Sequence, residues 1–239
     1  MVSEPERPGL RYELKLAGQE ASYPRLAMAL RIQPAAIRTL YPARRVQSIY
    51  LDTPFDRALA ENLAGISHRE KLRFRWYGDG CEEVRGTLER KVRENTLGWK
   101  ETFSIEEPMR VQGAHRTAFV AALAHAVPDE WRYRLDGLEP VQWISYLREY
   151  LTTADRRVRL TIDRELLSWD QRGLVRLSNA RSAAAPRSRV FVLELKCAPA
   201  HLDVAEDIVR RLPWPVDRCS KFVLASDPTH GPVPSLEPL

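Results

Sequence analysis

The chain has 239 residues, of which 44% are hydrophobic and 29% are charged, and its formal net charge is +5 at pH 7. These values are typical of a folded globular protein and exclude a disordered or collagen-like chain. No apolar run approaches the ~20 residues of a membrane-spanning helix, and the N-terminus lacks the pattern of a secretory signal. The three cysteines are far apart and form no C-x-x-C pair, which favours a reducing, cytoplasmic location over a disulfide or zinc scaffold.

Short segments that alternate polar and apolar residues, with β-branched or aromatic content, are predicted strands. Segments with apolar residues at three-and-four spacing are predicted helices. In chain order, the sequence predicts a strand at 11–16, a helix at 19–31, a strand at 46–52, a helix at 55–63, strands at 70–78 and 86–93, a helix at 114–127, strands at 143–151, 157–163, 174–178 and 190–196, and a helix at 202–212.

The connections between these elements carry turn and cap signals. Residues 78–80 and 171–173 are predicted hairpin turns, and Asp52-Thr53-Pro54 is a predicted helix cap with the proline in the first turn. We find no internal repeat and no compositional break. The predicted organisation is a flexible N-terminus at 1–10, a single α+β domain dominated by antiparallel strands at 11–226, and a disordered proline-rich tail at 227–239.

Arginine is the default cation of this chain, because only six of its 37 basic residues are lysine. Each lysine lies in or beside a predicted strand, whereas a neutral pattern would scatter them over the surface. Lysine is a compact point charge and a good phosphate ligand, distinct from the planar arginine fork. We therefore interpret all six as retained for a purpose: Lys15, Lys71, Lys91, Lys100, Lys196 and Lys221.

Residues two apart on a strand point to the same side, so the charged residues of each predicted strand share one face. A half-buried sheet with its polar face in water explains any single strand. It does not explain why these faces concentrate cations with about one carboxylate apiece. The shared faces hold Glu13, Lys15, Lys71, Arg73, Arg75, Glu89, Lys91, Arg93, Arg148, Arg159, Asp163, Glu194 and Lys196.

An alternative arrangement closes the strands into a barrel, with the apolar side against helices and the charged side facing a lumen. A confined surplus of positive charge is too costly to leave unpaired, so it implies a polyanionic guest. The few carboxylates on these faces could hold a divalent metal that the phosphates of the guest also ligate.

Several motifs recur in a characteristic order over residues 11 to 225, and KLRFRWYG, LERK and VLELK with a final SK are specific in combination. The chain resembles the VTC domain (vacuolar transporter chaperone), the polyphosphate polymerase branch of the triphosphate tunnel metalloenzyme (CYTH-like) superfamily. The matching stretches are YELK (12–15), SIYLDTPF (48–55), KLRFRWYG (71–78), LERK (88–91), SYLREYL (145–151), VRLTID (158–163), VLELK (192–196) and SKF (220–222).

The resemblance implies an α+β fold with an antiparallel β-barrel tunnel, flanking helices, and Mn²⁺ or Mg²⁺ as cofactor. The implied activity is that of an ATP-dependent polyphosphate polymerase, a phosphotransferase that moves the γ-phosphate of ATP onto inorganic polyphosphate. Together with the strand faces, the resemblance predicts Arg73, Arg75, Arg148 and Lys91 as catalytic residues, Lys15, Lys100, Arg159, Lys196, Arg218, Ser220 and Lys221 as phosphate-binding residues, and Glu194 and Glu13 as metal ligands.

The sequence departs from its relatives in two respects. Arg218 stands where the eukaryotic relatives have a lysine, which keeps the charge but changes the hydrogen-bond geometry. The phosphate-sensing SPX domain and the transmembrane segment of those relatives have no counterpart in these residues, which leaves a separate membrane protein open as a partner.

Two other functions stay open beside the polymerase. Triphosphatases and adenylate cyclases of the superfamily begin with E-x-E-x-K, whereas this chain has Arg11-x-Glu13-x-Lys15. The missing carboxylate weakens a two-metal hydrolase, so a triphosphatase is the second hypothesis. The third is a non-catalytic binder of polyphosphate. Nucleic acid is disfavoured as a partner because the cations alternate within strands and form no exposed run.

Familiar catalytic motifs are missing from the sequence. It contains no P-loop, no H-E-x-x-H and no G-x-S-x-G, and its histidines are scattered. Phosphoryl transfer requires mainly positioning and charge neutralisation. The terminal phosphate of a polyphosphate chain is already ionised, so a polymerase needs no general base.

Overall fold

The computed structural model describes residues 11–94, 97–180, 189–217 and 219–226. One antiparallel sheet of eight strands forms its centre, in the order β1-β8-β7-β6-β2-β3-β4-β5. The sheet and its flanking helices confirm the expected α+β class. The strands are β1 (Tyr12–Gln19), β2 (Arg38–Asp52), β3 (His68–Tyr77), β4 (Glu83–Glu94), β5 (Leu97–Arg110), β6 (Glu139–Thr152), β7 (Val158–Asp170) and β8 (Val190–Cys197).

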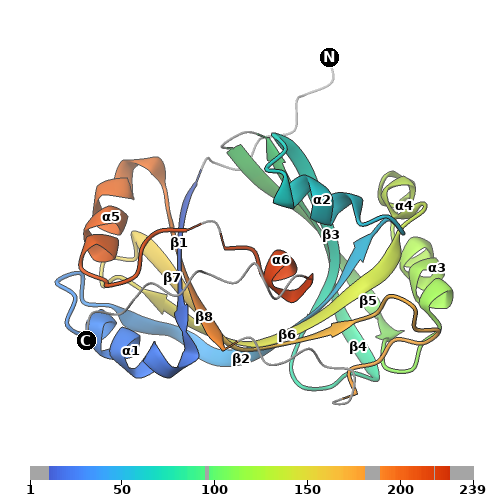
Figure 1. Cartoon of the computed structure of the whole chain (residues 1–239), viewed down its shortest axis with the longest axis horizontal. Coiled ribbons are helices and arrows are strands. Elements are labelled where there is room, and N and C mark those ends of the chain that lie inside the picture. The colour runs from blue at the N-terminus through green and yellow to red at the C-terminus, as the bar shows by residue number, and fades with distance from the viewer. Residues whose placement is uncertain (1–10, 95–96, 181–188, 218, 227–239) are drawn as a thin grey trace.

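Helices cover the outer side of the curled sheet at two places, and a short helix lies on its inner side (Figure 1). Short 3-10 helices at Glu20–Ser22 and Pro199–His201 precede two of the α-helices. No helix in the described ranges is long and apolar enough to cross a bilayer. The helices are α1 (Tyr23–Arg31), α2 (Arg57–Leu63), α3 (Arg116–Ala126), α4 (Asp129–Leu135), α5 (Leu202–Arg210) and α6 (Lys221–Ser226).

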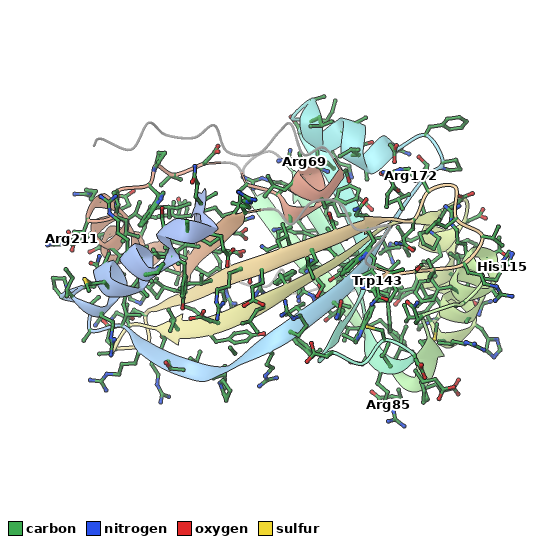
Figure 2. All side chains as sticks on the ribbon, turned by 60° about the horizontal axis from the view of Figure 1, so that its bottom comes forward. Arg69, Arg85, His115, Trp143, Arg172 and Arg211 are labelled. Carbon is green, nitrogen blue, oxygen red and sulfur yellow. The ribbon has the colours of Figure 1, made fainter. Side chains whose placement is uncertain are left out.

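Two apolar cores lie on the outer side of the sheet. One packs side chains of β2–β6 against α3 and α4, and includes Phe74 and Trp143. The other packs β1, β7 and β8 against α1 and α5, and includes Leu193. Figure 2 shows Arg211 beside the second core and His115 beside the first, at opposite ends of the molecule. Because each core anchors one end of the sheet, the strands between them are held in a fixed curve.

A third apolar cluster lies on the inner side, where α6 packs against the sheet. Phe222 and Leu224 of α6 are buried against Val46, Ile144 and Val192. The ring of Phe222 stacks on Tyr50 with centroids 4.9 Å apart. Figure 1 shows α6 within the curve of the sheet. The inner side is therefore divided between an apolar part covered by α6 and a charged part.

The sheet is strongly curled but is not closed, which corrects the expected barrel. Among the described residues β1 and β5 share no backbone hydrogen bonds, and each is an end of the sheet. The outer edge of β1 is occupied instead by a C-terminal segment: Leu16 forms a bridge with Val216, and the amide of Asp217 donates to the carbonyl of Lys15 at 2.9 Å. This segment takes the position that β5 would need for closure.

Strand β5, which has no counterpart among the predicted elements, is an edge strand. The side chains on its outer face are not all apolar, because Glu101 lies between Trp99 and Phe103. The carboxylate of Glu101 accepts hydrogen bonds from Arg90 and from the indole of Trp99 at 3.1 and 3.2 Å. This local ion pair interrupts the apolar alternation on which strand prediction depends.

The predicted strand at 174–178 is wrong, and the turn predicted at 171–173 is present, with the amide of Leu174 donating to the carbonyl of Gln171 at 3.3 Å, but it closes no hairpin. The segment forms only an isolated bridge between Arg176 and His115. Its backbone groups bond to residues 113–116 before α3, as in the pair from Leu177 to Ala114 at 2.9 Å. The segment thus has the alternating polar and apolar residues of a strand, but no strand of the sheet pairs with it.

Helix α2 is capped from a distance. The carboxylate of Asp52 accepts hydrogen bonds from the amides of Ala58 and Leu59 at 2.8 and 3.0 Å. Pro54 precedes the helix, which begins at Arg57, so the expected proline in the first turn is wrong. Helices α4 and α6, each of seven residues or fewer, were not predicted. The predicted flexible N-terminus and disordered tail lie outside the described residues.

Candidate active site

Strand alternation places a set of charged side chains on the inner side of the curled sheet. Cross-strand pairs share a face, and the register pairs Lys15 with Glu194 and Lys91 with Lys100. We call this set the basic face. It comprises ten cations (Lys15, Lys71, Arg73, Arg75, Lys91, Lys100, Arg148, Arg159, Lys196 and, from α6, Lys221) and four carboxylates (Glu13, Glu89, Asp163 and Glu194).

Glu89 holds three of these cations together. Nε and Nη2 of Arg73 donate to its Oε2 at 2.8 and 2.6 Å, and Nη1 of Arg75 donates to Oε1 at 3.3 Å. Nζ of Lys100 donates to the same Oε1 at 3.0 Å. Burial alone would raise the pKa of Glu89, but Arg73, Arg75 and Lys100 outweigh burial and hold that pKa well below its ordinary value. Glu89 therefore stays ionised and fixes both guanidinium groups side by side.

Arg75 retains an unused donor. The residue is buried, and its Nε has no hydrogen-bond partner among the described residues. A buried N–H without an acceptor is costly, more so on a charged group. An oxygen of an anionic guest would satisfy it. Arg75 thus points to a ligand from the structure itself, independently of any motif.

Asp163 organises a second pair of cations. Its carboxylate is almost fully buried and accepts Nε and Nη2 of Arg148 at 2.6 and 2.7 Å. Nζ of Lys221, from α6, lies 2.5 Å from the same carboxylate. Burial raises the pKa of Asp163, while Arg148 and then Lys221 lower it further than burial raises it. The planar fork of Arg148 is therefore held rigidly, and α6 is tied to the sheet by the same carboxylate.

A third group of charges surrounds Glu13 and Glu194. Lys15 lies 2.6 Å from Glu13, and Lys196 lies 2.6 Å from Glu194. Lys91 reaches Glu13 from β4 at 3.5 Å. Burial, and then Lys15, lowers the pKa of Lys91 to about 8 although the two carboxylates oppose this. The cluster holds more positive charge than its carboxylates neutralise.

The donor chemistry at Glu13 and Glu194 fits a divalent ion that shares its ligands with a bound phosphate. No group of three or more His, Cys, Asp or Glu residues suited to a metal exists in the described ranges. The described side chains therefore do not form a complete metal site by themselves, and a bound phosphate would have to supply further ligands. Mg²⁺ is commonly bound by one or two carboxylates together with phosphate oxygens and water. Burial, and then the charge of Glu194, raise the pKa of Glu13, although Lys15, Lys91 and Lys196 lower it by more. A cation beside the two carboxylates would relieve the repulsion between them.

The remaining predicted residues are placed less uniformly. Nζ of Lys71 donates to Oγ of Ser220 at 2.8 Å, and burial followed by the charge of Lys91 lowers the pKa of Lys71 well below its ordinary value. Arg159 stands opposite Lys196 in the register but is exposed, with no ion pair among the described residues. Arg218 lies outside the described residues.

The structure places among these cations four residues whose role sequence reasoning missed, because it named no tyrosine and offered the carboxylates of the strand faces only as metal ligands. Glu89 and Asp163 were recognised only as members of charged strand faces. The alternation signal also contained Tyr146, two residues before Arg148. Tyr50 had no such signal, because its relation to Arg73 arises from pairing between β2 and β3.

Comparisons with known proteins agree with this architecture. A proposed adenylate cyclase from Vibrio parahaemolyticus superposes with a TM-score of 0.50 at 12% identity, covering 91% of this chain and 99% of that one. A second proposed adenylate cyclase, from Bacillus halodurans, gives 0.51 at 15% identity, covering 89% and 94%. These likenesses concern the tunnel (CYTH-like) fold alone. No curated protein matches the sequence at a significant level.

The family comparison covers nearly the whole described structure. The match to the VTC domain runs over residues 11–229, and therefore includes every strand of the sheet, α6 and all the side chains of the basic face. This extent agrees with the motif order seen in the sequence. The chain belongs to the VTC domain family and has the fold of the triphosphate tunnel superfamily.

Proposed function

We propose that this protein is a polyphosphate polymerase that transfers the γ-phosphate of ATP to the end of an inorganic polyphosphate chain. The observation that carries the proposal is the pairing of Arg73 and Arg75 on Glu89, with Nε of Arg75 buried and unpartnered. Two adjacent guanidinium groups on one wall can bind the same phosphoryl group. The proposed substrates are ATP, or another nucleoside triphosphate, and inorganic polyphosphate.

The transferring phosphoryl group would lie between Arg73, Arg75 and Arg148. Negative charge on its oxygens spreads in the transition state, and rigidly held donors stabilise that charge without reorganising. Glu89 and Asp163 provide this rigidity by fixing the guanidinium planes. The arginines therefore act by orientation and electrostatic stabilisation, and Arg75 offers the additional Nε donor.

The lysines would hold the neighbouring phosphates of donor and chain. Lys15, Lys91 and Lys196 surround Glu13, and Lys71 and Lys221 approach from the side of α6. Glu194 and Glu13 would hold a divalent ion, Mn²⁺ or Mg²⁺, which when bound supplies further neutralisation of phosphate oxygens. The acceptor is a terminal phosphate that is already ionised, so this chemistry requires no general base.

The decisive experiment separates three activities of one basic site. Purified protein is incubated with ATP, a short polyphosphate primer and either Mn²⁺ or Mg²⁺, and the products are resolved by gel electrophoresis and phosphate release. Long polyphosphate supports the proposal. Free phosphate without chain growth would make the protein a triphosphatase, and tight binding of polyphosphate without turnover would make it a binder. Arg211→Ala serves as the matched control for loss of an arginine, because Arg211 directly follows α5 at one end of the molecule (Figure 2) and pairs with Asp207, outside the basic face.

A further inference from the structure

Two tyrosine hydroxyls lie directly against the paired arginines of the basic face. Nη1 of Arg73 donates to Oη of Tyr50 at 2.7 Å, and Nη2 of Arg75 donates to Oη of Tyr146 at 3.2 Å. Both tyrosines are buried, with exposed fractions of 6% and 1%. Their rings come from different strands, β2 and β6. Each of the two arginines held by Glu89 therefore has its own tyrosine hydroxyl, and both tyrosines come from the side of β3 opposite to Glu89.

Hydrogen-bond accounting leaves both phenolic hydrogens without an acceptor. A guanidinium group only donates, so each tyrosine oxygen must accept, and its own hydrogen must point elsewhere. Among the described residues, neither hydroxyl donates to a carboxylate, a carbonyl or another side chain. Buried polar hydrogens are nearly always paired. The hydroxyls of Tyr50 and Tyr146 and the Nε of Arg75 are therefore three neighbouring donors for which the described residues offer no acceptor.

Within the part of the chain that the structure describes, the surroundings of the tyrosines supply further cations and no carboxylate that is without a partner. The guanidinium carbon of Arg148 lies 5.3 Å, and Nζ of Lys221 5.2 Å, from the ring centre of Tyr146. The guanidinium carbon of Arg73 lies 5.5 Å from that of Tyr50. The nearby carboxylates of Glu89 and Asp163 already accept from the arginines and lysines. An acceptor for the phenols therefore comes from water or from a guest, and the surrounding cations favour a guest that is an anion.

We propose that Tyr50 and Tyr146 donate hydrogen bonds from their hydroxyls to oxygens of the phosphate group bound by Arg73 and Arg75. This inference rests on the proposed function for the location of that phosphate. Each tyrosine hydroxyl then accepts a hydrogen bond from its arginine, which polarises the phenol oxygen, and donates its own hydrogen to an oxygen of the phosphate. Two neutral donors add directional binding at a place where additional cations would repel those already present.

The electrostatics at Tyr146 agree with such a role. Burial raises the pKa of Tyr146, but Arg148 and Arg75 lower it by more than burial raises it. A more acidic phenol is a stronger hydrogen-bond donor to an anion. The ring of Tyr50, stacked on Phe222, keeps its hydroxyl in place by packing, so a phenylalanine at either position would retain the ring and remove only the donor.

The test uses Tyr50→Phe and Tyr146→Phe in the full chain, with inorganic tripolyphosphate as probe and chelator present to remove metal. Isothermal calorimetry measures the dissociation constant, and thermal unfolding checks the fold. The dissociation constant of each variant for tripolyphosphate is expected to rise about tenfold, because one hydrogen bond to a charged group is lost. Tyr23→Phe is the matched control, because its hydroxyl donates to Glu149 at 2.8 Å, outside the basic face, and its binding should not change.

A second arm separates donation to phosphate from the mere positioning of Arg75. If Tyr146 acts only by holding Arg75, then Tyr146→Phe has no effect on tripolyphosphate binding in an Arg75→Ala background. Direct donation predicts that most of the loss persists there. Unchanged binding by both single variants, or disappearance of the Tyr146 effect in that background, would overturn the inference. A wild-type protein that binds tripolyphosphate but makes no polyphosphate would reject the polymerase and leave the tyrosine contacts standing.

Discussion

Nζ of Lys91 on β4 lies 3.5 Å from Oε1 of Glu13 on β1. These strands are the seventh and the first of eight in the order of the sheet. In a flat sheet they would lie almost at opposite edges, yet here an ion pair joins them. This contact shows that the curvature brings opposite ends of the basic face within reach of one small guest. Phosphate groups bound there would contact side chains from nearly every strand.

Replacement of Glu194 by glutamine should abolish metal-dependent turnover while the protein remains folded. The amide keeps the volume of the side chain but removes the charge that would hold the cation. Activity is measured with Mn²⁺ and with Mg²⁺, and folding by circular dichroism. Because Lys196 loses its partner at 2.6 Å, binding of polyphosphate without metal should not weaken. Wild-type metal-dependent rates in this variant would reject Glu194 as a ligand.

Replacement of Arg75 by alanine should lower kcat more than it raises KM for ATP. The interaction of Arg75 with the phosphoryl oxygens strengthens as charge spreads in the transition state, and a lost donor of this kind typically reduces kcat by ~10²-fold or more. Steady-state kinetics with Arg211→Ala as the control provide the comparison. If Arg75 serves only to capture anions, KM alone would rise.

Binding of tripolyphosphate near pH 8.5 should take up protons. Burial and Lys15 lower the pKa of Lys91 to about 8, so above this pH the free protein holds the amine largely neutral, and a polyanion raises the pKa and restores the charge. Calorimetry in two buffers with different heats of ionisation, with chelator present, counts the protons. Lys91→Arg should take up fewer, because arginine stays charged throughout. Equal proton uptake in both proteins would contradict the assignment to Lys91.

The same shift gives the sign of a stability change. Between about pH 8 and the ordinary lysine value of 10.5, the unfolded chain binds a proton at Lys91 that the folded chain does not. The contribution of this residue to the free energy of unfolding therefore increases as pH rises through that window. Comparing urea unfolding of wild type and Lys91→Met at pH 7.5 and 10 isolates it. The free energy of unfolding of wild type minus that of Lys91→Met should be larger at pH 10 than at pH 7.5.

Replacement of Phe222 by alanine should lower the free energy of unfolding by about 3–4 kcal/mol. The ring is buried, stacks on Tyr50 and belongs to the inner apolar cluster. Chemical denaturation measures the loss. Since Lys221 and Ser220 adjoin this ring, tripolyphosphate binding should also weaken, whereas Met28→Ala on the exposed side of α1 should change neither quantity. A variant with unchanged stability would show that α6 does not pack as described.

Replacement of Gly86 by alanine should lower the free energy of unfolding by about 1–3 kcal/mol. It should also lower activity, because it displaces the backbone that carries Arg75. A Cβ at this position would clash with the carbonyl oxygen of Arg75 and would lie 2.8 Å from the ring of Phe74, so strands β3 and β4 would have to separate. Thermal unfolding and ATP kinetics report the two effects. Gly113→Ala, where no atom lies within 4 Å but φ is +74°, provides a control that strains the backbone without crowding Arg75.

Local alternation was sufficient to predict which side chains share a face. On β3, Lys71, Arg73 and Arg75 do lie opposite Leu72, Phe74 and Trp76, and the apolar three are buried beneath the helices. The period of a strand makes this inference independent of tertiary structure. The order of the strands was not predicted, because composition and spacing carry no information on which strands pair, and the tunnel was expected chiefly from the resemblance.

What could not be predicted depends on contacts between distant parts of the chain. The C-terminal segment at 214–217 pairs with β1, and this prevents the closure that an alternating set of strands suggests. Tyr50 joins the site through its pairing with Arg73 across two strands. The helix α6 is too short for periodicity to reveal, yet Phe222 and Lys221 tie it to the sheet.

The open seam between β1 and β5 has a consequence for the topology of a polymer guest. A ring of hydrogen-bonded strands can be entered by a long chain only through its ends, so every added unit would have to be threaded. Here Lys91 of β4 and Glu13 of β1 meet across the seam through an ion pair, and β1 and β5 share no backbone ladder among the described residues. On the proposed function, a polyphosphate chain would then enter from the side without threading, which we call lateral loading. The ease of such lateral loading should rise with ionic strength, because salt screens the ion pair that spans the seam.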